Sequence, residues 1–175
     1  TDRATAKAFS ALAAAGVAFL MVGADPAEAL PSYARQTGQP CATCHTAFPE
    51  LTPYGRRFKI GGYTAGGGDW QGPPISAMYM PGFTRTASNQ DAPPAPGLHV
   101  NNNLASQQVS GFIAGQLYGN LGSFIQITGD PVGGTVGLDA SDVRYADTLK
   151  LFGKNTIWGI DANNAPTVED PWNTT

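Results

Sequence analysis

The chain has 175 residues, of which 13% are charged, and its formal net charge at pH 7 is −3. Nucleic-acid-binding proteins present a basic patch or stripe, so this composition argues against that class. The sequence contains no P-loop, no Ser-His-Asp set and no paired carboxylates at a useful spacing, which leaves hydrolytic enzymes without a catalytic motif. The length suits one small domain, or a small segment joined to part of something larger.

Residues 1–29 have the organisation of a secretory signal peptide. Arg3 and Lys7 supply a positive n-region, an apolar run occupies residues 8–24, and Ala27-Glu28-Ala29 offers small residues at the cleavage positions. A membrane anchor is the alternative, but an apolar run of about 17 residues is at the lower limit for a spanning helix. We therefore expect an exported protein whose mature part begins at Leu30.

The next feature along the chain is Cys41-Ala42-Thr43-Cys44-His45, a C-x-x-C-H motif. This spacing is typical of covalent c-type haem attachment. Each cysteine can form a thioether to a haem vinyl group, and His45 is placed to bind the iron as the proximal ligand. Export agrees with this interpretation, because c-type haem is attached outside the cytosol. We predict one covalent haem c held by Cys41, Cys44 and His45.

Other interpretations of the motif account for it less well. A structural zinc site needs about four N or S ligands, and the chain supplies two cysteines and two histidines, His45 and His99. His45 directly follows Cys44, an awkward spacing for one tetrahedron. A thioredoxin-like pair is expected near a βαβ pattern, which does not surround the motif. A disulfide between Cys41 and Cys44 would leave His45 unexplained.

Residues 30–72 form the predicted haem-binding segment. Pro31, Gly38 and Pro40 predict an irregular approach to the motif. Thr52-Pro53 predicts the start of a short helix, with a capping hydroxyl followed by proline at the first helical position. Gly61-Gly62 predicts the end of that helix. The helix carries three basic residues that either bind haem propionates or an acidic partner, or form a solvated face: Arg56, Arg57 and Lys59.

Residues 73–175 form a predicted β region, which follows a linker rich in Gly and Pro. Apolar and polar residues alternate with period two, which indicates strands. We expect about five: at residues 75–84, two within 109–128, and two near 135–145 and 155–162. Gly119-Asn120 is a two-residue hairpin signature between the second and third strands. The predicted fold is thus mainly β, an antiparallel meander preceded by a small N-terminal helical haem segment.

The predicted strand number raises a physical problem for a membrane barrel. A barrel must close, because lipid cannot satisfy an open sheet edge, and known barrels use at least eight strands. We interpret the meander as part of an incomplete β-barrel. The alternatives are a fragment of a longer protein, several copies that pair their edges, or a small soluble sheet.

The stretch from Gly38 to Lys59, which includes the C-x-x-C-H motif, resembles the N-terminus of a bacterial monohaem cytochrome family. In that family a small haem segment precedes an outer-membrane β-barrel, as in porin–cytochrome iron oxidases. Five shorter stretches are also similar to such proteins: residues 76–78, 101–105, 142–147, 151–154 and 163–172. The resemblance implies a location in the periplasm or outer membrane of a Gram-negative-type bacterium. It also implies electron exchange with redox partner proteins or an extracellular donor such as ferrous iron.

The second axial ligand of a c-type haem is commonly a Met or a second His, and methionine raises the reduction potential. After residue 29 the sequence offers Met78, Met80 and His99. Met78 is the preferred ligand, because it shares with Ser76, Met80 and Thr84 the strand face that we expect to point inward. The alternatives are that both methionines fill gaps in a core and that His99 is simply solvated.

Together these features predict a monohaem c-type cytochrome that carries out single-electron transfer in the cell envelope and, in its fullest form, across the outer membrane. An electron carrier is favoured over a catalyst, because a haem enzyme would need an open sixth position. The alternative is an exported β-barrel pore in which the haem segment is a plug or a sensor.

Overall fold

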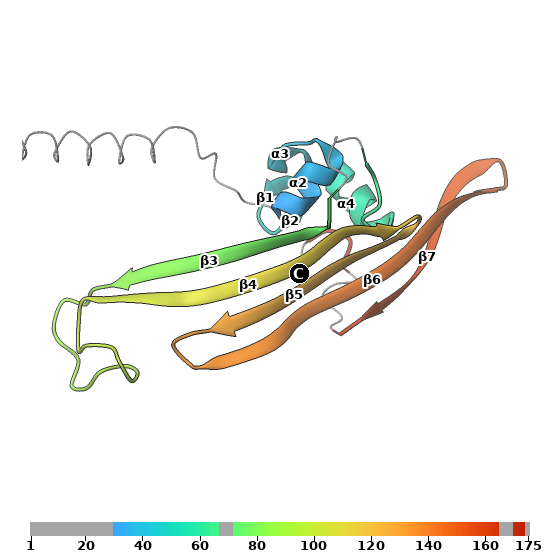
Figure 1. Ribbon diagram of the computed structural model, residues 1–175. Coiled ribbons are helices and arrows are strands. Elements are labelled where there is room, and N and C mark those ends of the chain that lie inside the picture. The colour runs from blue at the N-terminus through green and yellow to red at the C-terminus, as the bar shows by residue number, and fades with distance from the viewer. Residues whose placement is uncertain (1–29, 67–71, 165–169, 174–175) are drawn as a thin grey trace, which may run out of the picture.

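The computed structural model describes residues 30–66, 72–164 and 170–173. The predicted signal peptide, residues 1–29, lies outside the described residues. The protein is mainly β, with 51% of the described residues in strands and 14% in helices. Figure 1 shows a small helical segment seated on one side of a long, twisted antiparallel sheet. None of the described helices has the length and apolar composition needed to cross a membrane.

The helical segment, residues 30–66, contains three short helices and a two-stranded hairpin. These elements are α2 (Pro31–Thr37), α3 (Cys41–Cys44), β1 (His45–Ala47), β2 (Glu50–Leu51) and α4 (Pro53–Ile60). The helix predicted after Thr52 is confirmed: the Thr52 side chain accepts a hydrogen bond from the Gly55 N–H, and the helix ends before Gly61.

The predicted irregular approach to Cys41 is wrong for residues 31–37, whereas residues 38–40 are irregular as predicted. Residues 31–37 form the helix α2, which has Pro31 in its first turn and ends at Gly38 in the left-handed conformation with φ of 67°. Proline at the first helical position and glycine after the last one are the ordinary signals that start and stop a helix. The two residues therefore bracket a helix instead of preventing one.

The sheet is an antiparallel meander in the order β3-β4-β5-β6-β7. Within the described residues it is open, with β3 and β7 at its edges. Its strands are β3 (Ile75–Thr84), β4 (Asn103–Tyr118), β5 (Leu121–Asp130), β6 (Thr135–Leu151) and β7 (Lys154–Asn163). The five predicted strands and the hairpin at Gly119-Asn120 are confirmed.

Two strands are longer than their sequence pattern predicts. β4 begins at Asn103 rather than near residue 109, and β6 continues past Tyr145 to Leu151. Both extensions pair with a neighbouring strand: residues 103–106 of β4 with the end of β3, and residues 146–151 of β6 with the start of β7. Cross-strand pairing thus sets these ends, and the local alternation underestimates them.

One face of the sheet, the inner face, carries the helical segment. The Ser32 and Ser76 hydroxyls lie 3.4 Å apart across this junction. The inner face is rich in polar side chains that bond to one another, such as Ser110 to Thr128 at 2.8 Å and Thr128 to Asp139 at 2.8 Å. Ser76 lies on this face of β3, as predicted.

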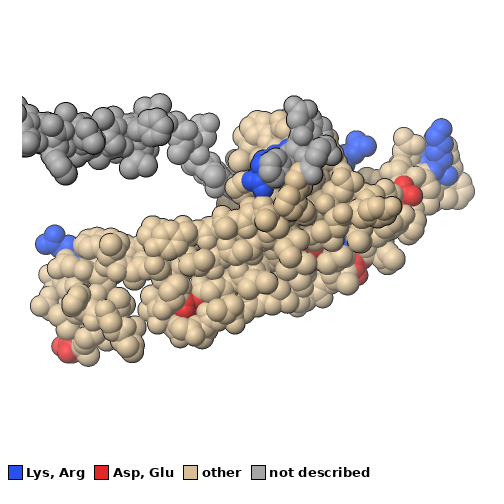
Figure 2. Space-filling view, in the orientation of Figure 1, with Lys and Arg blue, Asp and Glu red and all other residues tan. Residues whose placement is uncertain are grey.

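The opposite, outer face is apolar and exposed. Its exposed large side chains come from all five strands and include Ile75, Tyr79, Phe83, Leu104, Val109, Ile113, Ile127, Val136, Leu138, Leu149, Leu151, Trp158 and Ile160. In Figure 2 the charged side chains of the sheet lie mainly toward its ends, and the visible surface between them is largely uncharged. The sheet is therefore polar on the side that carries the helical segment and apolar on the other.

Residues 170–173 return to the helical segment. The Leu51 N–H donates to the Trp172 carbonyl at 2.8 Å, and Asn173 forms a β-bridge with Glu50. The Arg56 guanidinium stacks over the Trp172 ring at 4.3 Å from its centroid. Residues 170–173 are thus joined to the helical segment at β2 and α4.

Candidate haem site

The Cys-x-x-Cys-His motif occupies a single helical turn and the residue after it. Cys41 and Cys44 are the first and last residues of α3, and His45 follows in extended conformation. Residues three apart in a helix are neighbours on its surface. The two thiols therefore lie on one side of α3; both cysteines are half-buried, and no disulfide joins them.

Thr52 and Gly55 hold this turn in place from the helix α4. The Thr52 hydroxyl donates to the Thr43 carbonyl at 2.5 Å, and the Thr52 N–H donates to the Cys44 carbonyl at 2.9 Å. A Cβ atom on Gly55 would collide with the carbonyl oxygen of Cys44. Only glycine allows this close approach of two backbones.

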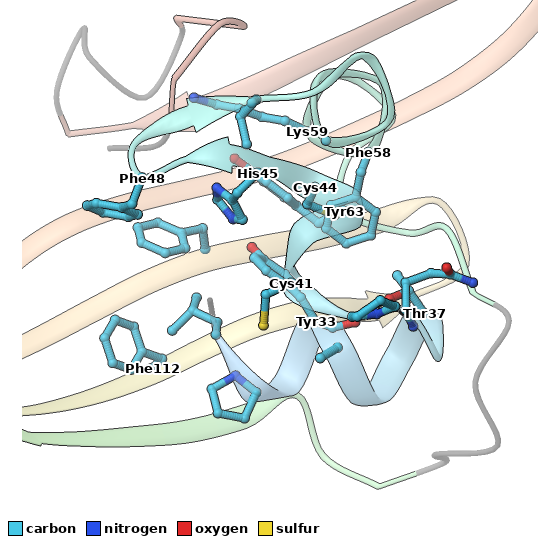
Figure 3. A pocket seen from close by; sticks show the side chains of 18 of the residues that line it. Tyr33, Thr37, Cys41, Cys44, His45, Phe48, Phe58, Lys59, Tyr63 and Phe112 are labelled. Carbon is cyan, nitrogen blue, oxygen red and sulfur yellow. Dashed lines mark hydrogen bonds between the residues drawn. The ribbon is translucent and has the colours of Figure 1, made fainter. Parts of the chain in front are cut away.

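A cavity of about 720 Å³ lies between the helical segment and the inner face of the sheet. Its size falls within the roughly 300–1,000 Å³ of small-molecule and cofactor pockets. The helical segment contributes Cys41, Cys44 and His45 to its lining, and the sheet contributes Met78, Met80, Phe112, Phe124 and Gln126. Figure 3 shows the motif side chains and Phe112 around the same space.

The candidate distal ligands are divided by the fold. Met78 and Met80 line the cavity that the motif also lines. His99 is exposed in the loop between β3 and β4, where its N–H and carbonyl bond to the Asn103 side chain at 2.6 and 2.7 Å. It is not among the lining residues of the cavity. The structure thus brings the two methionines to the motif and leaves His99 apart.

Burial shifts the pKa values of Cys44 and Lys59, which both line the cavity. Burial raises the pKa of the Cys44 thiol, and the neighbouring Cys41 raises it further, so the thiol stays protonated at neutral pH. Burial lowers the pKa of Lys59, as does Arg144 to a smaller extent. The Lys59 ammonium donates to the carbonyl oxygens of Asp170 at 2.6 Å and Asn173 at 2.8 Å. Of the three basic residues of α4, Lys59 therefore faces the interior, whereas Arg57 is exposed.

An aromatic cluster of Tyr33, Phe58 and Tyr63 forms part of the cavity wall. The ring of Tyr33 stacks on Tyr63 at 5.6 Å and meets the edge of Phe58 at 5.0 Å. The Tyr63 hydroxyl donates to Asp142 of β6 at 2.6 Å. This contact between the helical segment and the sheet was not predicted. The available signal was a pair of charged residues, Asp142 and Arg144, at alternate positions of a strand and thus on one face.

Across residues 30–66, 72–164 and 170–173, no group of three or more His, Cys, Asp and Glu side chains is arranged to hold a metal ion. Comparison of the chain with models of known protein families, with curated proteins and with solved structures finds no match. The chemistry of the site therefore follows from its residues alone. Two thiols on one helical turn, an adjacent imidazole and a cavity with aromatic and methionine walls suit a flat, apolar cofactor attached through sulfur.

Proposed function

We propose that the protein is a monohaem c-type cytochrome that transfers single electrons in the cell envelope. The observation that carries the proposal is that Cys41, Cys44 and His45 line one cavity together. Cys41 and Cys44 would hold the haem by thioether bonds, and His45 would bind its iron. The haem supplies reversible one-electron oxidation and reduction, and the protein tunes it through ligand and environment.

The chain's own residues serve this role by shaping the environment. Phe112 and Phe124 cover the sheet side of the cavity, where they exclude water and lower the local dielectric constant. Met78 is the proposed distal ligand, with Met80 as its neighbour on the same wall. Residues 30–66 carry Arg35, Arg56, Arg57 and Lys59 against Glu50 alone, in a chain of net charge −3. This local surplus of positive charge favours binding of haem propionates or of an acidic redox partner protein.

The direct test is production of the full chain in a bacterium that exports it and attaches c-type haem. We expect a sharp c-type α-band in the reduced spectrum and haem that stays with the polypeptide on a denaturing gel. The matched control is the Cys41→Ser/Cys44→Ser variant, which should lose both signals. A wild-type protein that lacks both signals contradicts the proposal.

The two faces of the sheet support an outer-membrane location. Outer-membrane barrel strands alternate between apolar residues toward lipid and polar residues toward the interior, which is the polarity of the outer and inner faces here. A barrel strand needs about 9–11 residues to cross the bilayer, and each of the five strands has 10 or more. We propose that the sheet is part of a β-barrel whose haem exchanges electrons with redox partner proteins or an extracellular donor.

A second candidate function is a pore module in which the helical segment is a plug or a sensor. The pore is favoured because the helical segment lies on the polar inner face, and the polar face of a membrane barrel lines its lumen. Conductance separates the two functions. Vesicles that leak ions without haem-dependent electron transfer support the pore, whereas electron transfer across intact vesicles supports the cytochrome.

A further inference from the structure

Two buried side chains of opposite charge stand beside the cavity. Asp142 of β6 has no exposed surface, and Lys59 of α4 is 5% exposed. The two residues are far apart in the sequence: Asp142 belongs to the sheet and Lys59 to the helical segment. Lysine and aspartate are almost never fully buried unless they are paired, so the arrangement around each of them needs an explanation.

Asp142 belongs to a charged network on the inner face. Its carboxylate lies 3.0 Å from the Arg144 guanidinium, which also lies 3.2 Å from the Asp161 carboxylate. One arginine thus serves two aspartates, and the network carries one uncompensated negative charge. The strand register pairs Asp142 with Phe124, a lining residue of the cavity, so this charge is one strand away from the cavity wall.

Tyr63 connects this network to the cavity. Its ring lines the cavity and its hydroxyl donates to Asp142 at 2.6 Å. Burial raises the pKa of Tyr63, and Asp142 raises it further, so the phenol keeps its proton and remains a donor. The backbone of Tyr63 has a φ of 59°. A bulky residue in this left-handed region is a genuine outlier, held by its surroundings.

Lys59 supplies the opposite charge from the helical side. It lines the cavity, and its ammonium is bonded to the carbonyl oxygens of Asp170 and Asn173 rather than to a carboxylate. The Arg144 guanidinium donates to the Lys59 carbonyl at 3.5 Å, which joins the two sides. The ionisable groups at this junction are Tyr33, Tyr63, Lys59, Asp142, Arg144, Asp161 and Asp170, whose exposed carboxylate also attracts the Lys59 ammonium.

We propose that Asp142 and Lys59 set the reduction potential of the haem with opposite sign. The inference rests on the proposed function. Reduction adds one negative charge to the cavity, so a buried carboxylate opposes it and a buried ammonium favours it. Charges in the interior are screened little by salt, so both effects persist at high ionic strength. Asp161 acts in the same direction as Asp142 but more weakly, because its side chain is 27% exposed.

The test is spectroelectrochemical titration of the haem-loaded full chain. Asp142→Asn should raise the equilibrium constant for reduction roughly threefold to tenfold, where tenfold equals about 59 mV for one electron. Lys59→Gln should lower it by a similar factor, and the double variant should return near the wild-type value. Asp161→Asn should give a smaller rise. Asp91→Asn, the same charge change in the exposed loop between β3 and β4, is the matched control and should leave the potential unchanged.

The pattern of signs distinguishes tuning from a structural role. Loosening the fold would move the potential in one direction for every variant, whereas charge tuning moves it in opposite directions and cancels in the double variant. If Asp142→Asn does not fold, Asp161→Asn and Lys59→Gln still report both signs. Haem-loaded variants that shift in the same direction, or not at all, overturn the inference while the proposed function stands. A wild-type chain without covalent haem overturns both.

Discussion

The helical segment and the sheet differ in what they bury. The helical segment buries large side chains, including Leu51, Phe58 and Tyr63, around the cavity. The sheet exposes most of its large apolar side chains on the outer face, and its three largest fully buried side chains are Asp142, Ser110 and Ser123. A soluble sheet that packs on a small domain would place its apolar face toward that domain. The polarity here is the reverse, and our proposal of a lipid-facing outer face rests on this observation.

The two regions therefore contribute different groups to the candidate site. The helical segment supplies the two thiols and the imidazole that we propose to hold the haem, all within five consecutive residues. The sheet supplies the opposite wall of the cavity, a charged network and an apolar surface that faces away. Four predictions test these separate contributions of the helical segment and the sheet.

The largest effect is expected from a charge on the outer face. Ile113→Arg places a guanidinium on the outer face between the apolar residues Ile75 and Ile125, which flank it in the register. For a lipid-facing position near the bilayer midplane the cost is about 2–4 kcal/mol. We expect a reduced fraction of protein that floats with vesicles in a density gradient. Gln108→Arg on the inner face of the same strand is the control, and equal flotation of the two variants would argue against a lipid-facing outer face.

A backbone substitution in the helical segment should cost more than the same change in the sheet. Gly55→Ala forces a methyl group against the Cys44 carbonyl, whereas a Cβ on Gly111 of β4 meets nothing within 4 Å. We expect Gly55→Ala to destabilise the protein by about 1–3 kcal/mol and to lower the yield of covalent haem. Gly111→Ala should leave both nearly unchanged. Urea titration and haem staining measure the two effects, and similar results for both variants would contradict the close approach of α3 and α4.

The contact between the two regions should appear in the pH dependence of stability. Tyr63→Phe removes a hydrogen bond to a buried carboxylate, which should cost about 1–3 kcal/mol at pH 7. Because the Tyr63 pKa is raised in the folded state from its ordinary value of 10.0, the unfolded chain loses this proton first as the pH rises. Stability of the wild type should therefore fall above about pH 10.

In Tyr63→Phe the loss of stability with rising pH should be shallower, because the variant lacks one of the tyrosines whose pKa is raised in the folded state. Burial also raises the pKa of Tyr33, so part of the slope should remain. Urea titrations from pH 7 to pH 11 measure both slopes. An alkaline slope that is identical in the two proteins would mean that Tyr63 does not stay protonated at this junction.

The smallest effect concerns the sheet side of the cavity. Methionine ligation raises the reduction potential, so Met78→Ala should lower the equilibrium constant for reduction by roughly tenfold. It should also open the iron to carbon monoxide, which a spectrum of the reduced protein detects. Met80→Ala is the matched control on the same strand. Carbon monoxide binding in Met80→Ala alone would assign the ligand to Met80, and binding by the wild type would mean that neither methionine occupies the position.

Several features were predictable because they depend on neighbours in the sequence. Thr52-Pro53 and Gly61 delimit α4 through capping, and Gly119-Asn120 forms the hairpin turn between β4 and β5. The inward direction of Met78 follows from the alternation of β3. The helix α2 was missed although its signals, Pro31 and Gly38, are equally local.

The remaining features depend on long-range pairing. Tyr63 and Asp142 are 79 residues apart, and the Lys59 ammonium reaches Asp170, 111 residues away. No local pattern relates such residues, because their contact exists only once the meander has brought β6 beneath the helical segment. The same holds for the separation of His99 from the cavity, since the loop between β3 and β4 lies at the far end of the sheet from the helical segment (Figure 1).

The amino-acid sequence by itself determined the groups of the candidate haem site, the number of strands and the two polarities of the sheet. These follow from the spacing of a few adjacent residues and from a period of two. The tertiary structure decided which wall faces Cys41, Cys44 and His45, and which buried charges stand beside them. The reason is that the pairing of the five strands sets the position of every inner-face side chain relative to the helical segment. The energy of this pairing is spread over residues that are far apart in the chain.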